Sequence, residues 1–289
     1  SARAALARGE AVFVLNVPAN FTRDLLRGEL AALLVEADAT DPVATGTALG
    51  AVEQIARSVA RKDAGGALGY LAAGEAPFAV HVHRLYNPEG SSRNNIVPGL
   101  MGVILTLMMV LMTGLAMTRE RERGTMENLL AMPVRPLEVM AGKIVPYVAI
   151  GLLQVTLILC VAVFVFRVPF LGSLAALYLA ALLFVAANLT VGITLSSLAK
   201  NQLQAMQMTV FYFMPNLLLS GFMFPFQGMP GWAQCLGNVL PLTYFNRLVR
   251  AIFLKGTPGW DLWPNVWPLM LFTAVVMAIA VKFYRKTLD

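Results

Sequence analysis

Five long apolar stretches constrain this chain more than any other feature of its sequence. Each holds about 20 residues without a charged side chain, the number that a helix needs to cross a hydrocarbon core at ~1.5 Å per residue. Only 13% of the 289 residues are charged, whereas an ordinary soluble domain carries about 25%. The sequence therefore predicts a mainly α polytopic membrane protein, with transmembrane helices at about 96–118, 144–166, 174–195, 206–226 and 262–281.

Lysine and arginine are distributed unevenly between the two ends of these helices. The segments that follow the first, third and fifth helices share one side and carry nine basic residues, against four on the other side. Basic residues favour the cytoplasmic side, so we expect the C-terminus in the cytoplasm and residues 1–95 outside it. An external N-terminal region needs a helix to carry it across, so we expect a further span before Ser1, six in all. The formal charge of +6 then reflects topology and not nucleic acid binding.

Residues 1–95 have the mixed patterning of an extracytoplasmic α+β domain followed by a linker into the first span. Runs rich in β-branched residues predict strands, and helical apolar periodicity predicts helices. We expect strands at 11–17 and 78–85, helices at 21–28 and 45–62, and a further apolar run at 30–36. The linker follows at 86–95 and the transmembrane domain at 96–289.

The histidines and cysteines do not form a recognisable metal or disulfide pattern. His81 and His83 share one face of the last predicted strand, but no third ligand has a supporting spacing. Cys160 falls inside the second span and Cys235 in an outer loop, so neither position suggests a disulfide partner. We expect no metal site and two unpaired cysteines.

The segment 227–261, between the last two predicted spans, is too apolar for a free tether. Its apolar residues predict two short helices separated by Pro241. We expect the segment to dip into the outer leaflet as a re-entrant element, or to cap the spans. Backbone that is not helical at such a depth needs protein or water to satisfy its polar groups.

The predicted spans lack the ionisable side chains that gradient-driven transporters use. No Asp, Glu, Lys, Arg or His falls within them, and such groups mark function when they occur in a membrane. Asn188, Gln207 and Asn216 are candidates for a substrate pathway, although hydrogen bonding between helices is the favoured interpretation. The sequence has no G-x-x-x-x-G-K-[ST] phosphate loop. We therefore expect that the chain is not an enzyme and that ATP is hydrolysed in a separate subunit.

The connector 119–133 has the pattern of a docking helix. Its charged start extends the first span, Gly124 offers a helix stop, and Thr125 is a good N-cap for a short helix with one apolar stripe. If the connector is instead a solvated charge run, coupling would fall to the loop at 196–205. The residues predicted to couple the chain to an ATPase are Glu120, Arg121, Glu122, Arg123, Gly124, Thr125, Met126, Glu127, Leu129 and Leu130.

Several motifs, taken in order, resemble the ABC-2 permease family, in particular its members with a large external domain. The strongest is RERERGTMENLL at 119–130, followed by PVRPLE at 133–138 and GKIVPY at 142–147. SGFMFP at 220–225 and PLTY at 241–244 are similar to the family's fifth span and outer re-entrant element. FVLNVPANF and RLYNP, further upstream, are similar to its external domain.

The resemblance implies a subunit of an ATP-driven exporter of hydrophobic or amphipathic compounds in the bacterial inner membrane. Two permeases, identical or different, would each dock on an ATP-binding subunit that holds ATP and Mg, often with a periplasmic adaptor. This chain would hold no cofactor itself. The alternatives are a secondary transporter or channel, a membrane-embedded enzyme such as a lipid transferase, and a non-transporting scaffold. The resemblance places the outer gate at Ser220, Gly221, Phe224, Pro225, Pro241 and Tyr244.

Overall fold

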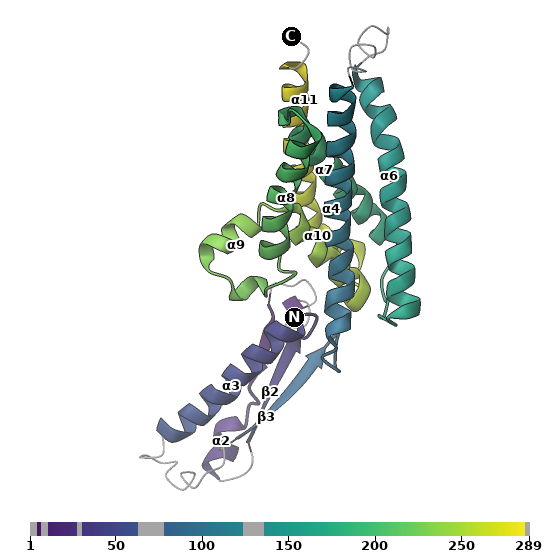
Figure 1. The fold of residues 1–289 in the computed structure, drawn as a ribbon. Coiled ribbons are helices and arrows are strands. Elements are labelled where there is room, and N and C mark those ends of the chain that lie inside the picture. The colour runs from purple at the N-terminus through teal and green to yellow at the C-terminus, as the bar shows by residue number, and fades with distance from the viewer. Residues whose placement is uncertain (1–4, 7–10, 28–30, 63–77, 124–135, 287–289) are drawn as a thin grey trace. The chain divides into compact units, whose positions relative to one another are not determined.

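The structure is a computed structural model that describes residues 5–6, 11–27, 31–62, 78–123 and 136–286 (Figure 1). The chain divides into two compact units, Ser1–Asn95 and Ile96–Asp289, and each is described by itself. Of the predicted coupling connector, only the part up to Arg123 falls within the described residues.

In its described part, the first unit has a three-stranded sheet together with the helices α2 and α3. Strand β2 lies in the middle, antiparallel to β1 and parallel to β3. Parallel neighbours need a crossover connection, and helix α3 lies on the one between β2 and β3. The turn into α3 is fixed by Asp38, whose side chain accepts a hydrogen bond from Thr40 N at 3.1 Å. The elements are β1 (Phe13–Asn16), α2 (Phe21–Leu26), β2 (Ala31–Asp38), α3 (Pro42–Lys62) and β3 (Phe78–Leu85).

The second unit consists of long helices, which confirms the prediction of a mainly helical chain. Helix α4 holds 31 residues, about 46 Å at ~1.5 Å per residue, so it is longer than a hydrocarbon core is thick. Among the residues that the structure describes, four stretches are long and apolar enough to cross a membrane: Ser92–Glu120, Ile144–Val165, Leu174–Leu198 and Gly259–Ala280. The helices are α4 (Ser92–Glu122), α6 (Pro136–Cys160), α7 (Leu174–Leu198), α8 (Gln202–Leu219) and α11 (Trp263–Lys286), and a π-helical turn, Val161–Val165, continues α6.

The window predicted at 206–226 is only partly helical. Helix α8 begins earlier, at Gln202, and ends at Leu219 after 18 residues. It stops because Gly221 adopts a φ of +79°, which favours glycine and turns the chain. At ~1.5 Å per residue α8 is about 27 Å long, so the prediction of a span extending to residue 226 was wrong in its bounds.

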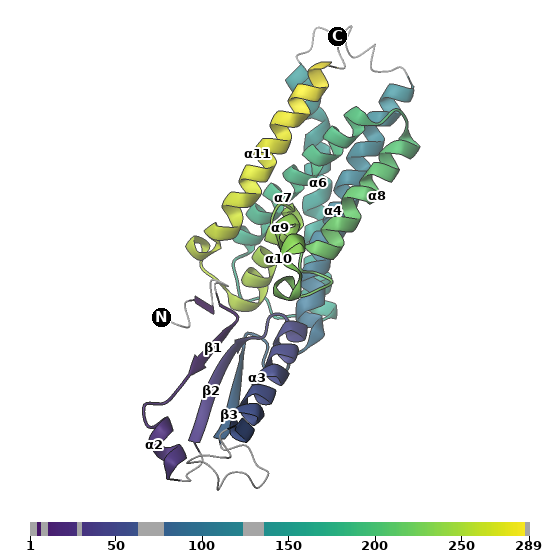
Figure 2. The ribbon, with the colours of Figure 1, turned by 90° about the vertical axis from the view of Figure 1, so that its left-hand side faces the viewer.

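Close backbone contacts bring α4, α6 and α7 together. A Cβ atom added at Gly192 of α7 would lie 2.8 Å from Thr113 Cβ of α4. One added at Gly151 of α6 would lie 2.9 Å from Val185 of α7 and 3.2 Å from the sulfur of Met109. Membrane helices pack closely where small residues let their backbones approach, so these glycines have a packing role. Figure 2 shows α4 and α7 inside the group of helices.

Two short helices are present on either side of Pro241, as the sequence predicts. They are α9 (Gly231–Gly237) and α10 (Pro241–Arg250), and Pro241 is the first residue of α10, where its missing N–H costs nothing. Helix α10 is almost wholly buried against the long helices, and the Phe245 ring stacks on Phe184 of α7 with 4.1 Å between centroids. A π-helical turn, Ala251–Lys255, and a 3-10 turn, Gly259–Leu262, lead into α11.

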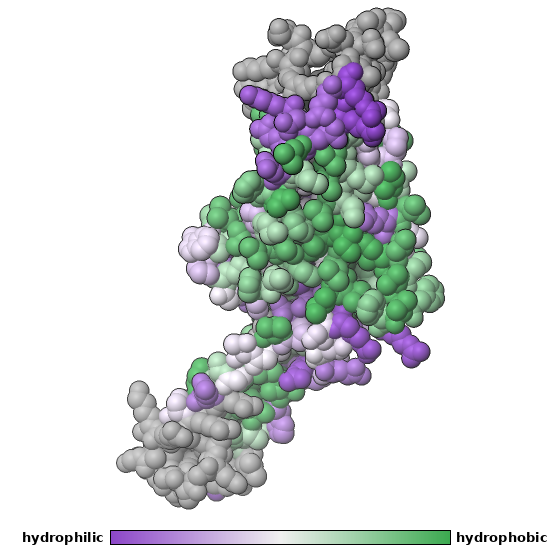
Figure 3. Space-filling view, in the orientation of Figure 1, coloured by the Kyte–Doolittle hydropathy of each residue, from purple (hydrophilic) through white to green (hydrophobic). Residues whose placement is uncertain are grey.

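A broad apolar surface covers the middle of the Ile96–Asp289 unit. On the face that Figure 3 shows, hydrophobic side chains cover the middle of this unit and hydrophilic ones gather at the end where α4 terminates. Large side chains that are more than half exposed occur on α6, α8 and α11, for example Leu157, Phe211 and Leu271. Soluble monomers rarely expose apolar patches of more than a few hundred Å², so this surface suits a bilayer.

Candidate functional site

The end of α4 is joined to the start of α8 by the side chain of Glu122. One carboxylate oxygen of Glu122 accepts a hydrogen bond from the backbone N–H of Gln202 at 2.7 Å, and the other accepts from the Gln202 side-chain amide. The residues are 80 apart in the chain. This contact connects the first residues of the predicted coupling connector to the turn between α7 and α8.

The Glu122 contact has a simple electrostatic basis. The first N–H groups of a helix have no partner inside the helix, and its N-terminus carries a partial positive charge. In α8, Asn201 caps the N–H of Gln204 at 2.8 Å while Glu122 takes that of Gln202. The hydrogen bonds from the side chain and then the backbone of Gln202 lower the pKa of Glu122 below its ordinary value, so the carboxylate is ionised at neutral pH.

The structure places only some of the predicted coupling residues. Glu120, Arg121, Glu122 and Arg123 lie at the end of α4 and just after it. Sequence reasoning selected Glu122 but missed its partner Gln202, although it named the 196–205 loop as the second candidate for coupling. The N-cap pattern at Asn201 predicts where α8 starts, but no sequence signal pairs it with α4. The other predicted coupling residues lie outside the described part: Gly124, Thr125, Met126, Glu127, Leu129 and Leu130.

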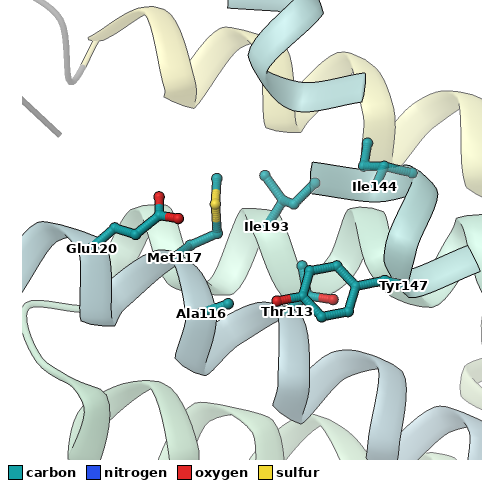
Figure 4. Close-up of a pocket in the computed structure, with 7 residues that line it drawn as sticks. All are labelled: Thr113, Ala116, Met117, Glu120, Ile144, Tyr147 and Ile193. Carbon is teal, nitrogen blue, oxygen red and sulfur yellow. The ribbon is translucent and has the colours of Figure 1, made fainter. Parts of the chain in front are cut away.

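A pocket opens beside the same end of α4. It measures about 350 Å³ including its open mouth and lies between α4, α6 and α7 (Figure 4). Glu120 is at one edge, the Tyr147 ring at the other, and Met117 and Ile193 lie between them. The lining is apolar apart from a few groups, as in most small-molecule sites. Its complete lining is Thr113, Ala116, Met117, Glu120, Ile144, Tyr147 and Ile193.

The predicted outer gate lies at the turn after α8. Ser220 is buried, and the Gly221 carbonyl accepts a hydrogen bond from Arg250 of α10 at 3.2 Å. A Cβ atom at Gly237 of α9 would lie 2.5 Å from the Leu219 carbonyl oxygen and 2.7 Å from the Phe226 ring. This turn is therefore held tightly against α9 and α10.

Some of the other predicted gate residues make contacts within the protein, and others are exposed. Tyr244 donates a hydrogen bond from its hydroxyl to the Asn238 carbonyl at 2.6 Å, and Pro241 starts α10. Phe224 is 54% exposed and Pro225 precedes a short 3-10 turn. Pro241 and Tyr244 thus fix the α9–α10 corner, while Phe224 faces the surroundings.

The polar residues predicted for a substrate pathway are not equivalent. Asn188 and Asn216 are fully buried, whereas Gln207 is exposed. Each buried amide donates to the carbonyl four residues earlier in its own helix, at 2.9 Å, so the expected hydrogen bonds between helices were wrong for these donors. Sequence reasoning missed Asn246, whose amide is buried near Gly102 of α4 with neither polar atom bonded to a described residue. The amphipathic pattern of its helix does not predict that this amide is buried without a hydrogen bond.

The two histidines and the two cysteines are all exposed. His81 and His83 are exposed on β3, and Cys160 and Cys235 are exposed and free. Among the residues that the structure describes, no three His, Cys, Asp or Glu side chains are grouped in a way that could hold a metal ion.

Comparison with known proteins identifies the family of this chain. A family model described as ABC-2 family transporter protein matches residues 1–282, nearly the whole chain. The chain belongs to the ABC-2 transporter family. Together with the apolar helices, this membership makes it a multi-pass membrane protein.

Three Escherichia coli relatives of this ABC-2 chain carry transport names. The probable multidrug ABC transporter permease YbhR is 32% identical over 71% of the chain, and YbhS, with the same description, is 34% identical over 69%. These matches cover 56% and 53% of the two relatives, so the chain spans about half their length. The inner membrane transport permease YhhJ is 30% identical over 99% of the chain and 76% of its own length.

Proposed function

We propose that this chain is the membrane-spanning permease subunit of an ATP-driven ABC exporter, powered by a separate ATP-binding subunit. The family match over residues 1–282 carries the proposal. The sequence adds a physical reason, because the spans predicted from it hold no Asp, Glu, Lys, Arg or His and it has no phosphate loop. Energy for transport would then enter from outside the spans, through a partner.

The partner would act at the end of α4. The connector 119–133 would dock on the ATP-binding subunit, and the Glu122 contact supports this because it ties the start of that connector to α8. A movement of the connector would then reach two helices at once. Glu122 and Gln202 lie at one end of the unit, in agreement with the charge count that assigns both segments to the cytoplasmic side.

The cargo would be hydrophobic or amphipathic. The names of YbhR and YbhS describe those relatives as probable multidrug permeases. Here, the apolar lining of the Glu120–Tyr147 pocket supports the same class of compound. An inner-membrane location, external residues 1–95, a second permease and a periplasmic adaptor complete the proposal. The outer turn at Ser220 and Gly221 would form the outer gate.

ATP hydrolysis by reconstituted vesicles tests the division of labour. The full-length permease should hydrolyse no ATP alone, and its cognate ATP-binding subunit should be active and stimulated by hydrophobic compounds only when the permease is present. The control is the same complex with the phosphate-loop lysine of the partner replaced. ATP hydrolysis by the rigorously purified permease would overturn the proposal. So would an ATP-binding subunit whose ATP hydrolysis is the same with and without the permease.

A further inference from the structure

Arg247 lies in an unusual setting for a cation. Its guanidinium carbon is 4.6 Å from the centre of the Phe226 ring and 5.8 Å from that of Tyr244. The side chain is half-buried in α10, among residues that are otherwise mostly apolar. Aromatic rings attract a guanidinium through their faces, but they leave its N–H groups, which point along the edges of the plane, without acceptors.

No anion among the described residues balances this charge. Arg247 makes no ion pair or hydrogen bond within the part of the chain that the structure describes, and its contacts are the two rings. Between residues 139 and 288 the sequence contains a single acidic residue, Asp261. Burial lowers the pKa of Arg247, as expected for a cation that has lost water without gaining an anion. A charge in this state favours an anionic ligand.

The neighbouring Arg250 differs from Arg247 because it has a backbone carbonyl as a partner. Its guanidinium donates to the Gly221 carbonyl at 3.2 Å and so helps to hold the turn after α8. Arg247 is one helical turn away and has no such carbonyl partner. The two arginines therefore have different surroundings: Arg250 contacts the backbone of the turn, whereas Arg247 contacts two aromatic rings.

The tryptophans indicate the depth of this site in the membrane. All four of the chain lie between residues 232 and 267, and their exposed fractions run from 50% to 92%. Tryptophan concentrates where hydrocarbon meets head groups. Helix α8 begins at Gln202 and is about 27 Å long, so the end of the unit where α8 stops lies about that far from Gln202. The tryptophan-rich end of the unit, where Arg247 contacts Phe226, therefore suits a membrane–water interface.

We propose that Arg247 binds the phosphate group of an amphiphile at the membrane–water interface, with Phe226 and Tyr244 holding the guanidinium plane. A guanidinium can offer two parallel N–H donors to a phosphate, a match that an ammonium group lacks. The phosphate could belong to a bilayer lipid or to an anionic amphiphile that the chain transports. Both sources share the same chemistry and the same site.

Native mass spectrometry of the full-length chain in detergent tests this site. Phosphatidylglycerol should bind the wild type more tightly than a diacylglycerol with the same acyl chains. R247Q should weaken phosphatidylglycerol binding about tenfold or more, the usual effect of losing a hydrogen bond to a charged group. R247K should fall between the two, because it keeps the charge without the planar fork. R167Q is the matched control, since Arg167 is an exposed cation in the loop that contacts residues 252–253.

A second ligand separates the two sources. If dodecyl phosphate competes with phosphatidylglycerol in the wild type but not in R247Q, the site takes single-chain anionic amphiphiles as well as lipids. If only phosphatidylglycerol binds, the ligand is a bilayer lipid. Equal binding of phosphatidylglycerol by R247Q and R167Q overturns the proposal. So does a wild type that does not distinguish phosphatidylglycerol from diacylglycerol, a result that needs no variant to fold.

Discussion

The turns at the two ends of the Ile96–Asp289 unit are held by different kinds of contact. At one end, a single exposed carboxylate, Glu122, accepts hydrogen bonds from the start of α8. At the other end, Phe245 stacks inside the protein, and Leu171 N donates to Phe253 O at 2.9 Å. Exposed charge-assisted contacts are weak and exchange with water, whereas packed backbone and ring contacts are hard to separate.

This difference suggests how movement would pass through the molecule. The Glu122 end can change its contacts at small cost, as a segment driven by a partner must. The α10 end would move as one block, because its turns are packed on each other. Under the proposed function, motion would enter at the adjustable end and be transmitted to the rigid one.

Removing the buried ring should damage the rigid end most. Phe245→Ala leaves a cavity beside Phe184, and such truncations cost about 3–5 kcal/mol in packed cores. Phe211→Ala, at a ring that is 79% exposed on α8, is the matched control and should cost much less. The measurement is the midpoint of thermal unfolding of both purified variants in the same detergent. Equal losses would mean that α10 is not part of a packed core.

A single methyl group should strain the same end less severely. A Cβ atom at Gly172 would lie 2.4 Å from the Ile252 carbonyl oxygen, a backbone atom that cannot rotate away. Gly172→Ala should therefore cost about 1–3 kcal/mol, the usual range for overpacking. Gly231→Ala should be nearly neutral, because nothing lies within 4 Å of its Cβ position. If both variants unfold at the wild-type temperature, the loop before α7 is not clamped as described.

At the adjustable end, Glu122→Ala should leave thermal stability nearly unchanged but reduce transport per ATP hydrolysed several-fold. Glu122→Gln keeps one acceptor oxygen for the Gln202 N–H and should lose less. Met112→Ala is the control, since Met112 is exposed on the same helix and lies outside the connector 119–133. Transport and ATP hydrolysis would be measured together in vesicles that contain the complex. If Glu122→Ala couples as well as Met112→Ala, the contact with α8 does not transmit motion.

The same contact should respond to acid. The pKa of Glu122 in the folded protein is lowered, so the stabilisation from its hydrogen bonds is present above the ordinary value of 4.5. It is lost as the pH falls through the lower folded-state pKa. The distribution of distances between spin labels at Arg123 and Asn201 should therefore stay unchanged from neutral pH down to about 4.5. Below that pH the distribution should broaden. A distance that changes near neutral pH would assign the response to another group.

Much of the architecture could be predicted because apolar length is a strong signal. The long helices and the two short ones around Pro241 lie near their expected positions. The end of α8 could not be predicted, because hydropathy continues through Phe222 and Phe224 after the turn at Gly221. Only the backbone angle of that glycine marks where the helix stops.

The candidate site was less accessible to sequence reasoning. Glu122 stood out as part of a charged run, but its partner Gln202 is distant in the chain and has no motif. Arg247 was counted only as a basic residue of the outer side. That no described residue supplies an anion to Arg247 follows from the folded surroundings of α10, which composition alone cannot give.

The most direct test of the account is ATP-driven transport by the reconstituted complex. Vesicles would contain the full-length permease and its cognate ATP-binding subunit, with a hydrophobic dye outside and ATP supplied on the side of the ATP-binding subunit. The account predicts that dye accumulates inside vesicles whose ATP-binding subunits face outward, that this requires hydrolysis, and that collapsing proton and sodium gradients leaves it unchanged. Dye movement that persists without ATP but disappears when an ion gradient is collapsed would contradict it.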